Sequence, residues 1–250
     1  MKAETEPIRS GQETSEIFEK HYEYVVIDPY AVNLIDKGPR KGKSRLSFYS
    51  AFALNATREL MEARVADNVI LFGDSSFGYQ TLNTAELMFL KLTQPGKGKT
   101  SVNRHNIFPF NDEDLNSTPA QVRELGDFVK DNKIDPSQIL YLTWDYHAQR
   151  VRNHLEGYGL KEVQVASVVD THKHFRPQFN QEKLDEVLPY EEIEKMESFR
   201  RRLSGIDKKG RIPLLLKPVL GGAYTLDNER GLDGQLHFMY KAGKKRLQEI

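Results

Sequence analysis

A Thr, an Asp, a His and an Arg follow one another closely where an apolar segment ends, in the sequence ILYLTWDYHAQR at residues 139–150. His147 and Arg150 are three positions apart, so on a helix they share one face. An imidazole can accept or donate a proton near neutral pH, and a guanidinium binds carboxylates and phosphates. The segment therefore indicates either an ordinary strand-to-helix junction or a binding site for an anionic ligand, with His147 as the candidate catalytic acid/base.

Similar polar residues follow the other apolar segments of the chain. In a sheet of parallel strands, ligands bind beyond the carboxyl ends of the strands, where helix N-termini present free N–H groups. The residues expected there, and therefore the candidate ligand-binding residues, are Asp28, Arg45, Gly73, Asp74, Ser75, Glu86, Ser117, Thr118, Thr143 and Arg150. The alternative interpretation for Thr118, and also for Asp145, is that the side chain only caps a helix.

A second group of possible ligands is DTHKH at residues 170–174. Asp170, His172 and His174 alternate, so on an extended chain they would share one face at the end of a strand. Such a group could bind zinc or another divalent metal with a water molecule in the open position. The alternative interpretation is a solvated loop that leaves the sheet, without any metal.

Two other glycine-containing patterns do not predict a nucleotide site. GKGKT at residues 96–100 has Thr93 where a phosphate-binding loop requires glycine, and it follows a predicted helix instead of a strand. GGAY at residues 221–224 lacks the spacing of a dinucleotide-binding fingerprint.

Alternating strands and helices would position the candidate site residues. Apolar runs predict strands at residues 22–28, 68–76, 106–110, 138–143 and 163–169, and helical spacing predicts helices at residues 44–63, 145–156 and from residues 83 and 118 onward. For the helix at residue 118, Thr118 is the expected N-cap, with Pro119 in the first turn and Gln121 completing a capping box. This alternation predicts a doubly wound, Rossmann-like α/β fold, with a mostly parallel sheet of about five strands and helices on both faces.

The predicted domain organisation has three parts. Residues 1–20 form an N-terminal tail, residues 21–175 the Rossmann-like ligand-binding domain, and residues 176–250 a C-terminal helix and extension packed on the core. In the extension, Pro189 begins a predicted helix that is acidic in its first turns and ends with Arg200, Arg201 and Arg202. This polarity complements the helix dipole, which favours an electrostatic cap over a nucleic-acid-binding patch.

Composition excludes several classes of function. The 36 basic and 36 acidic residues balance, so no overall charge favours nucleic acid or an anionic membrane. The chain contains no cysteine, which excludes thiolate nucleophiles and Cys-ligated metals. The charged N-terminus lacks the apolar core of a signal peptide, and no window is apolar enough to span a membrane. We therefore expect a cytoplasmic protein with a small-molecule ligand, whose oligomeric state stays open.

Four segments, in order, resemble the ElyC/SanA/YdcF-type family, a widespread bacterial domain of largely unknown function. They are SRLSFYSAF with Arg45, ILFGDSS with Gly73 and the later Glu86, NSTPAQV with Ser117 and Thr118, and ILYLTWDYHAQRV with Thr143, His147 and Arg150. The resemblance spans residues 22–169. It implies a Rossmann-like domain that binds a small nucleotide-like or anionic ligand, and S-adenosylmethionine is the best single candidate.

The sequence departs from the family pattern in three places. DPYAVN replaces a Gly-rich turn after the first strand, Asp74 and Ser75 stand where glycines are usual, and Ala120 and Gln121 replace a Glu-Asn pair. Glycines allow the backbone to approach a phosphate or sugar closely, so their loss points to a different ligand or a degenerate site. Two alternatives remain, namely a metal-dependent hydrolase or transferase at residues 170–174 and a non-catalytic ligand-sensing or protein-interaction module. Whether the protein is an enzyme stays open.

Overall fold

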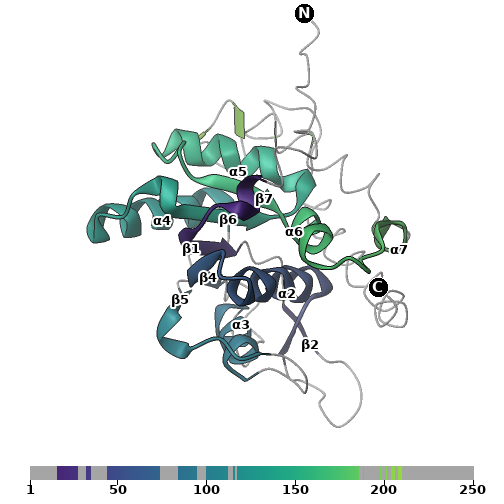
Figure 1. The fold of residues 1–250 in the computed structure, drawn as a ribbon. Helices are drawn as coiled ribbons and strands as arrows, with labels where there is room; N and C mark the ends of the chain where they lie inside the picture. Colours follow the sequence, from purple (N-terminus) through teal and green to yellow (C-terminus); the bar gives the residue numbers. More distant parts are fainter. Residues whose placement is uncertain are drawn as a thin grey trace, which may run out of the picture.

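The computed structural model describes residues 16–27, 32–34, 44–73, 84–94, 100–111, 115, 117–185, 188, 198, 201, 204–205 and 208–209. Its main feature is a five-stranded sheet with helices on both faces (Figure 1). The strands are β1 Tyr22–Ile27, β4 Ala66–Gly73, β5 Ile107–Asn111, β6 Ile139–Thr143 and β7 Gln164–Ser167, and the short strands β2 Val32–Leu34 and β3 Ser44–Leu46 pair separately. The helices are α2 Phe48–Glu62, α3 Thr84–Thr93, α4 Thr118–Asn132, α5 Asp145–Gly157, α6 Val168–Phe175 and α7 Gln181–Asp185.

The strand order, β5-β4-β1-β6-β7, is that of a Rossmann-like sheet, and all neighbouring pairs are parallel. From β1 the chain first builds outward through β4 to β5, and then returns to the other side of β1 to build β6 and β7. The direction therefore reverses between β1 and β6, the place where ligands bind in open α/β sheets. The predicted fold class is confirmed.

Each central strand is buried on both faces, which is why the strands have nearly continuous apolar sequences. In β6, Leu140 and Leu142 pack in the core under α2, α3 and α6, whereas Ile139 and Tyr141 pack in the core under α4 and α5. Figure 1 shows the same division, with α4 and α5 on one side of the sheet and α2, α3 and α6 on the other. The second of these cores holds α4 and α5 side by side on one face of the sheet.

Two helices begin at serine N-caps where the sequence predicted other boundaries. One helix begins later than predicted, and the other begins inside a predicted strand. The predicted helix at residues 44–63 begins only at Phe48, because Ser47 accepts a hydrogen bond from the Ser50 N–H at 3.1 Å and residues 44–46 pair with β2 instead. The predicted strand at residues 163–169 ends at Ser167, whose Oγ accepts from the N–H groups of Val169 and Asp170. The extended continuation into residues 168–174 was therefore wrong, since α6 begins there.

Residues before the first strand pack on the core where they are described. Ile17 and Phe18, within the predicted tail, are buried, and the Phe18 ring lies 5.6 Å from that of Phe175. The predicted helix from Pro189 falls mostly outside the described residues. None of the helices in the described part of the chain is both long and apolar enough to cross a membrane.

Candidate functional site

Thr118, His147 and Arg150 meet where α4 and α5 begin. The Thr118 Oγ1 lies 3.1 Å from Nε2 of His147, and the Arg150 Nη2 lies 2.5 Å from Nδ1 of the same ring. Thr118 is 5% exposed and His147 is 2% exposed, whereas Arg150 is partly exposed. The predicted contact between His147 and Arg150 thus exists, and Ala148, Val151 and Leu155 form the separate buried stripe of α5.

The contacts of the His147 ring define its neighbours and not its tautomer. Nη2 of Arg150 lies 2.5 Å from Nδ1 and 3.2 Å from Nε2 of the same ring. Because this atom is close to both nitrogens, it does not lie along the lone pair of either one. The Thr118 hydroxyl can donate to Nε2 or accept from it, since a hydroxyl does both.

The N-terminus of α4 lies beside this network without a side-chain cap. Its N-cap is Ser117, whose exposed side chain makes no capping hydrogen bond. The first bond within the helix runs from the Gln121 N–H to the Ser117 carbonyl, so the N–H groups of Thr118 and Ala120 have no partner within the helix. The predicted Thr118 cap and Gln121 capping box were wrong, because Thr118 turns to His147 and Gln121 Nε2 donates to the Leu115 carbonyl.

Three other predicted site residues lie at the carboxyl edge of the sheet. Thr143 ends β6 and is buried, beside Ser167 of β7. Glu86 lies half-buried in the first turn of α3. Gly73 ends β4, where an added Cβ would lie 2.7 Å from Cβ of Ala85. Close packing of α3 therefore explains the glycine at position 73 without a ligand.

Four predicted site residues are not brought into this arrangement by the described structure. Asp28, Asp74 and Ser75 lie outside the described residues. Arg45 belongs to β3, opposite Asn33 of β2, and its side chain lies outside what the structure describes. Among the described residues, the candidate site is centred on Thr118, His147 and Arg150.

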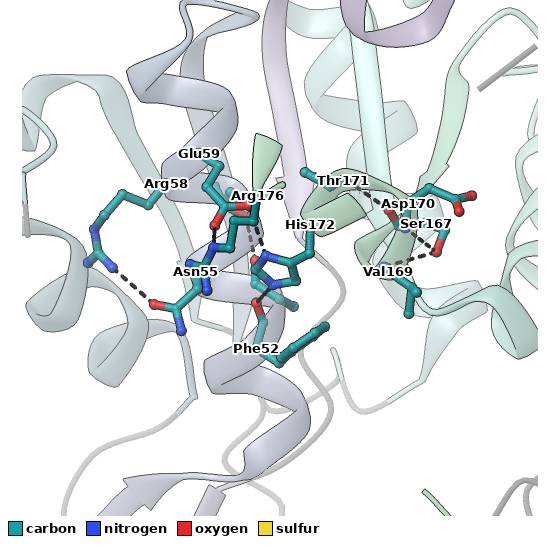
Figure 2. Close-up of polar contacts among 12 residues, drawn as sticks. Phe52, Asn55, Arg58, Glu59, Ser167, Val169, Asp170, Thr171, His172 and Arg176 are labelled. Atoms are coloured by element: carbon teal, nitrogen blue, oxygen red, sulfur yellow. Dashed lines mark hydrogen bonds and ion pairs between the residues drawn. The ribbon is translucent and has the colours of Figure 1, made fainter. Parts of the chain in front are cut away.

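The predicted shared face of Asp170, His172 and His174 does not exist, because residues 168–175 are helical. His172 is fully buried between two acceptors, with Nδ1 2.8 Å from Oε2 of Glu59 and Nε2 3.1 Å from the Phe52 carbonyl oxygen (Figure 2). Nε2 is thus hydrogen-bonded within the protein, and Nδ1 lies against a carboxylate oxygen. Among the described residues, no group of three His, Cys, Asp or Glu side chains is arranged to hold a metal ion.

Trp144, directly after β6, is the centre of an aromatic cluster under the α2 face of the sheet. Its indole is 1% exposed and stacks on Phe52 and Tyr146, with ring centroids 5.3 and 5.9 Å away. Tyr49 and Phe48 contact it at 5.3 and 6.2 Å. The cluster anchors the junction between β6 and α5, and so positions His147 and Arg150.

Sequence reasoning missed a polar link between the ends of β6 and β7. The Ser167 hydroxyl donates to Oδ1 of Asp145 while it caps α6, and Lys173 Nζ lies 3.8 Å from Oδ1 of Asp170. Asp145 is exposed, yet desolvation by the surrounding protein raises the pKa of its carboxyl, and the Asp170 charge raises it further against the hydrogen bond from Ser167. Desolvation also raises the pKa of Asp170. The signal in the sequence was Ser167, a helix-capping residue type inside the predicted strand at residues 163–169.

Replacing Asp145 with asparagine is expected to stabilise the protein at neutral pH. Because the folded state raises the pKa of Asp145, it binds the proton more tightly than the unfolded state, and this stabilisation is lost as pH rises from 3.8 through the folded pKa. Asparagine keeps the acceptor for Ser167 but carries no charge. Urea denaturation should show a variant minus wild-type difference that is near zero at pH 3 and grows toward pH 7. A difference that shrinks over that range would contradict the raised pKa.

Comparisons with known proteins do not identify a relative. No family model matches the sequence, and no curated protein and no solved structure shows a significant similarity to it.

Proposed function

We propose that this protein binds a small anionic or nucleotide-like ligand at the carboxyl edge of its sheet, where α4 and α5 begin. The observation that carries the proposal is the contact of Thr118, His147 and Arg150 between these helices. It is supported by the strand order, because the reversal point beside β1 and β6 is the usual ligand site of such sheets.

The chemistry of this group favours a ligand rich in hydrogen-bond acceptors. The Thr118 hydroxyl, the N–H groups in the first turn of α4 and the guanidinium of Arg150 are all donors. A helix N-terminus and a guanidinium also both favour negative charge. Carboxylate, phosphate or sugar hydroxyl groups would therefore suit this place better than a cation would.

The surroundings of His147 favour binding over acid/base catalysis. Its ring is 2% exposed, and its two nitrogens face Thr118 and Arg150. A histidine held in this way orients the Thr118 hydroxyl, which is the role of a positioning residue. This observation supports the non-catalytic, ligand-sensing alternative.

The order of the four sequence motifs leads us to propose a distant relationship to the ElyC/SanA/YdcF-type family, and S-adenosylmethionine as the first ligand to test. The metal-dependent alternative at residues 170–174 loses its geometric basis, because α6 turns His172 into the core, away from Asp170 and His174.

A thermal-shift screen of S-adenosylmethionine, nucleotides and sugar nucleotides tests the proposal. At least one ligand should raise the Tm of the wild-type protein, since a ligand that binds only the folded state stabilises it. The same ligand should raise the Tm of the His147→Ala and Arg150→Ala variants much less. If both variants respond as the wild type does, the ligand binds elsewhere.

A further inference from the structure

The second half of α5 contacts a later segment of the chain, here called the latch and defined as the described residues 201, 204, 205, 208 and 209. Asn153 Nδ2 lies 2.8 Å from Oγ of Ser204 and 3.5 Å from the Arg201 carbonyl oxygen. Lys208 Nζ forms an ion pair with Glu156 at 2.5 Å. These contacts span about 50 residues of sequence, so the latch connects the C-terminal part of the chain to α5.

Most of the hydrogen bonds recognise the backbone of the latch. Nδ1 of His154 lies 2.7 Å from the Lys208 carbonyl oxygen, and the Tyr158 hydroxyl donates to the Lys209 carbonyl at 3.0 Å. His154 is only 4% exposed. Because every peptide carries a carbonyl, this mode of recognition depends on the path of the backbone more than on latch side chains.

Gly157 allows the latch backbone to lie directly on the helix. A Cβ added at this position would lie 2.6 Å from Cβ of Lys208 and 2.7 Å from its carbonyl oxygen. Gly159, two residues later, has φ +78° and ends the helix, so glycine there has a conformational reason. Gly157 has a steric one, since Cβ and the carbonyl group of Lys208 occupy the place that a side chain would take.

We propose that the second half of α5 is a docking surface for a separate segment, and that its occupant is the chain's own latch. The same helix carries His147 and Arg150 one to three turns earlier. Docking of the latch thus holds the helix that supplies the proposed ligand site. This inference goes beyond the proposed function, and its test requires no ligand.

Trypsin cleavage of the full-length protein, followed by mass spectrometry, tests the docking of the latch in the Gly157→Ala variant. The docked latch protects the bond after Lys208, whose carbonyl is bound to His154. The added Cβ should release the latch and make cleavage there about tenfold faster than in the wild type. Gly205→Ala is the matched control, because a Cβ at Gly205 meets nothing within 4 Å, and its cleavage rate should be unchanged.

The direction of the change in cleavage rate distinguishes loss of latch docking from a change in helix stability. Alanine has a higher helix propensity than glycine, so without a docked latch Gly157→Ala would leave cleavage unchanged or make it slower. Tyr158→Phe removes only the hydrogen-bond donor to the Lys209 carbonyl and should also make cleavage after Lys208 faster. If Gly157→Ala does not fold, this second variant tests whether the latch is docked. Equal rates in the wild type and both variants would overturn the proposal. A wild-type rate that falls with protein concentration would do so too, because the latch would then dock on a second copy.

Discussion

Replacing Trp144 with alanine is expected to lower the free energy of unfolding by about 3–5 kcal/mol. The indole is buried among Phe48, Tyr49, Phe52 and Tyr146, so its removal leaves a cavity that these rings can only partly fill. Since domains of ordinary stability have about 5–15 kcal/mol in total, the variant should be close to unfolding. The loss should also loosen the start of α5, and with it His147 and Arg150.

Trp144→Phe is the matched comparison for this prediction. The indole Nε1 has no hydrogen-bond partner among the described residues, so phenylalanine loses volume but no hydrogen bond there. Its cost should be about 1–2 kcal/mol, clearly below that of alanine. Urea denaturation followed by circular dichroism measures both variants, because Trp144 is the sole tryptophan and its fluorescence is lost with it. Equal stabilities of the two variants would show that the ring is not packed as described.

Replacing Glu59 with alanine is the second change with a large expected effect, a loss of about 3 kcal/mol. One carboxylate oxygen of Glu59 faces Nδ1 of the buried His172, and the other accepts from Nε of Arg176 (Figure 2). The Glu59 side chain is 11% exposed, so alanine removes the carboxylate beside the buried imidazole of His172 and leaves the guanidinium of Arg176 without its counter-charge. The contact between α2 and α6 should weaken as a result.

Two further variants show whether this loss comes from the described contacts. Arg176→Ala should cost less than about 1 kcal/mol, because the guanidinium is partly exposed and water can replace its contact. Glu59→Gln, which keeps an acceptor, should fall between Glu59→Ala and the wild type. A double-mutant cycle with His172→Ala measures the pair directly. A coupling energy of zero between Glu59 and His172 would contradict the buried contact.

The fold could be predicted from the sequence because hydrophobic periodicity and helix signals agree in most segments. The apolar run in β6 and the helical stripe of Ala148, Val151 and Leu155 are local features that tertiary packing did not override. The end of β7 could not be predicted in the same way. Val168 and Val169 favour a strand, but Ser167 caps α6 with its side chain, and only the structure shows which preference prevails.

The candidate site was predictable in part for a similar reason. The spacing of His147 and Arg150 on one helix is a local property, so their contact could be anticipated. The burial of His172 against Glu59 depends on the packing of α6 on α2, which joins residues more than 100 positions apart. Spacing on an extended chain therefore suggested a metal site where the folded chain has a buried contact between an imidazole and a carboxylate.

Isothermal titration of S-adenosylmethionine, or of the strongest hit in the thermal-shift screen, tests the central claim most directly. The Kd should rise roughly 10- to 100-fold in Arg150→Ala, the expected loss of a hydrogen bond to a charged group. Arg123→Ala is the control for a general loss of positive charge, since Arg123 is exposed on α4, and its Kd should match that of the wild type. Thr118→Val should weaken binding as Arg150→Ala does. Equal Kd values for the wild type, Thr118→Val and Arg150→Ala would contradict a ligand site between α4 and α5.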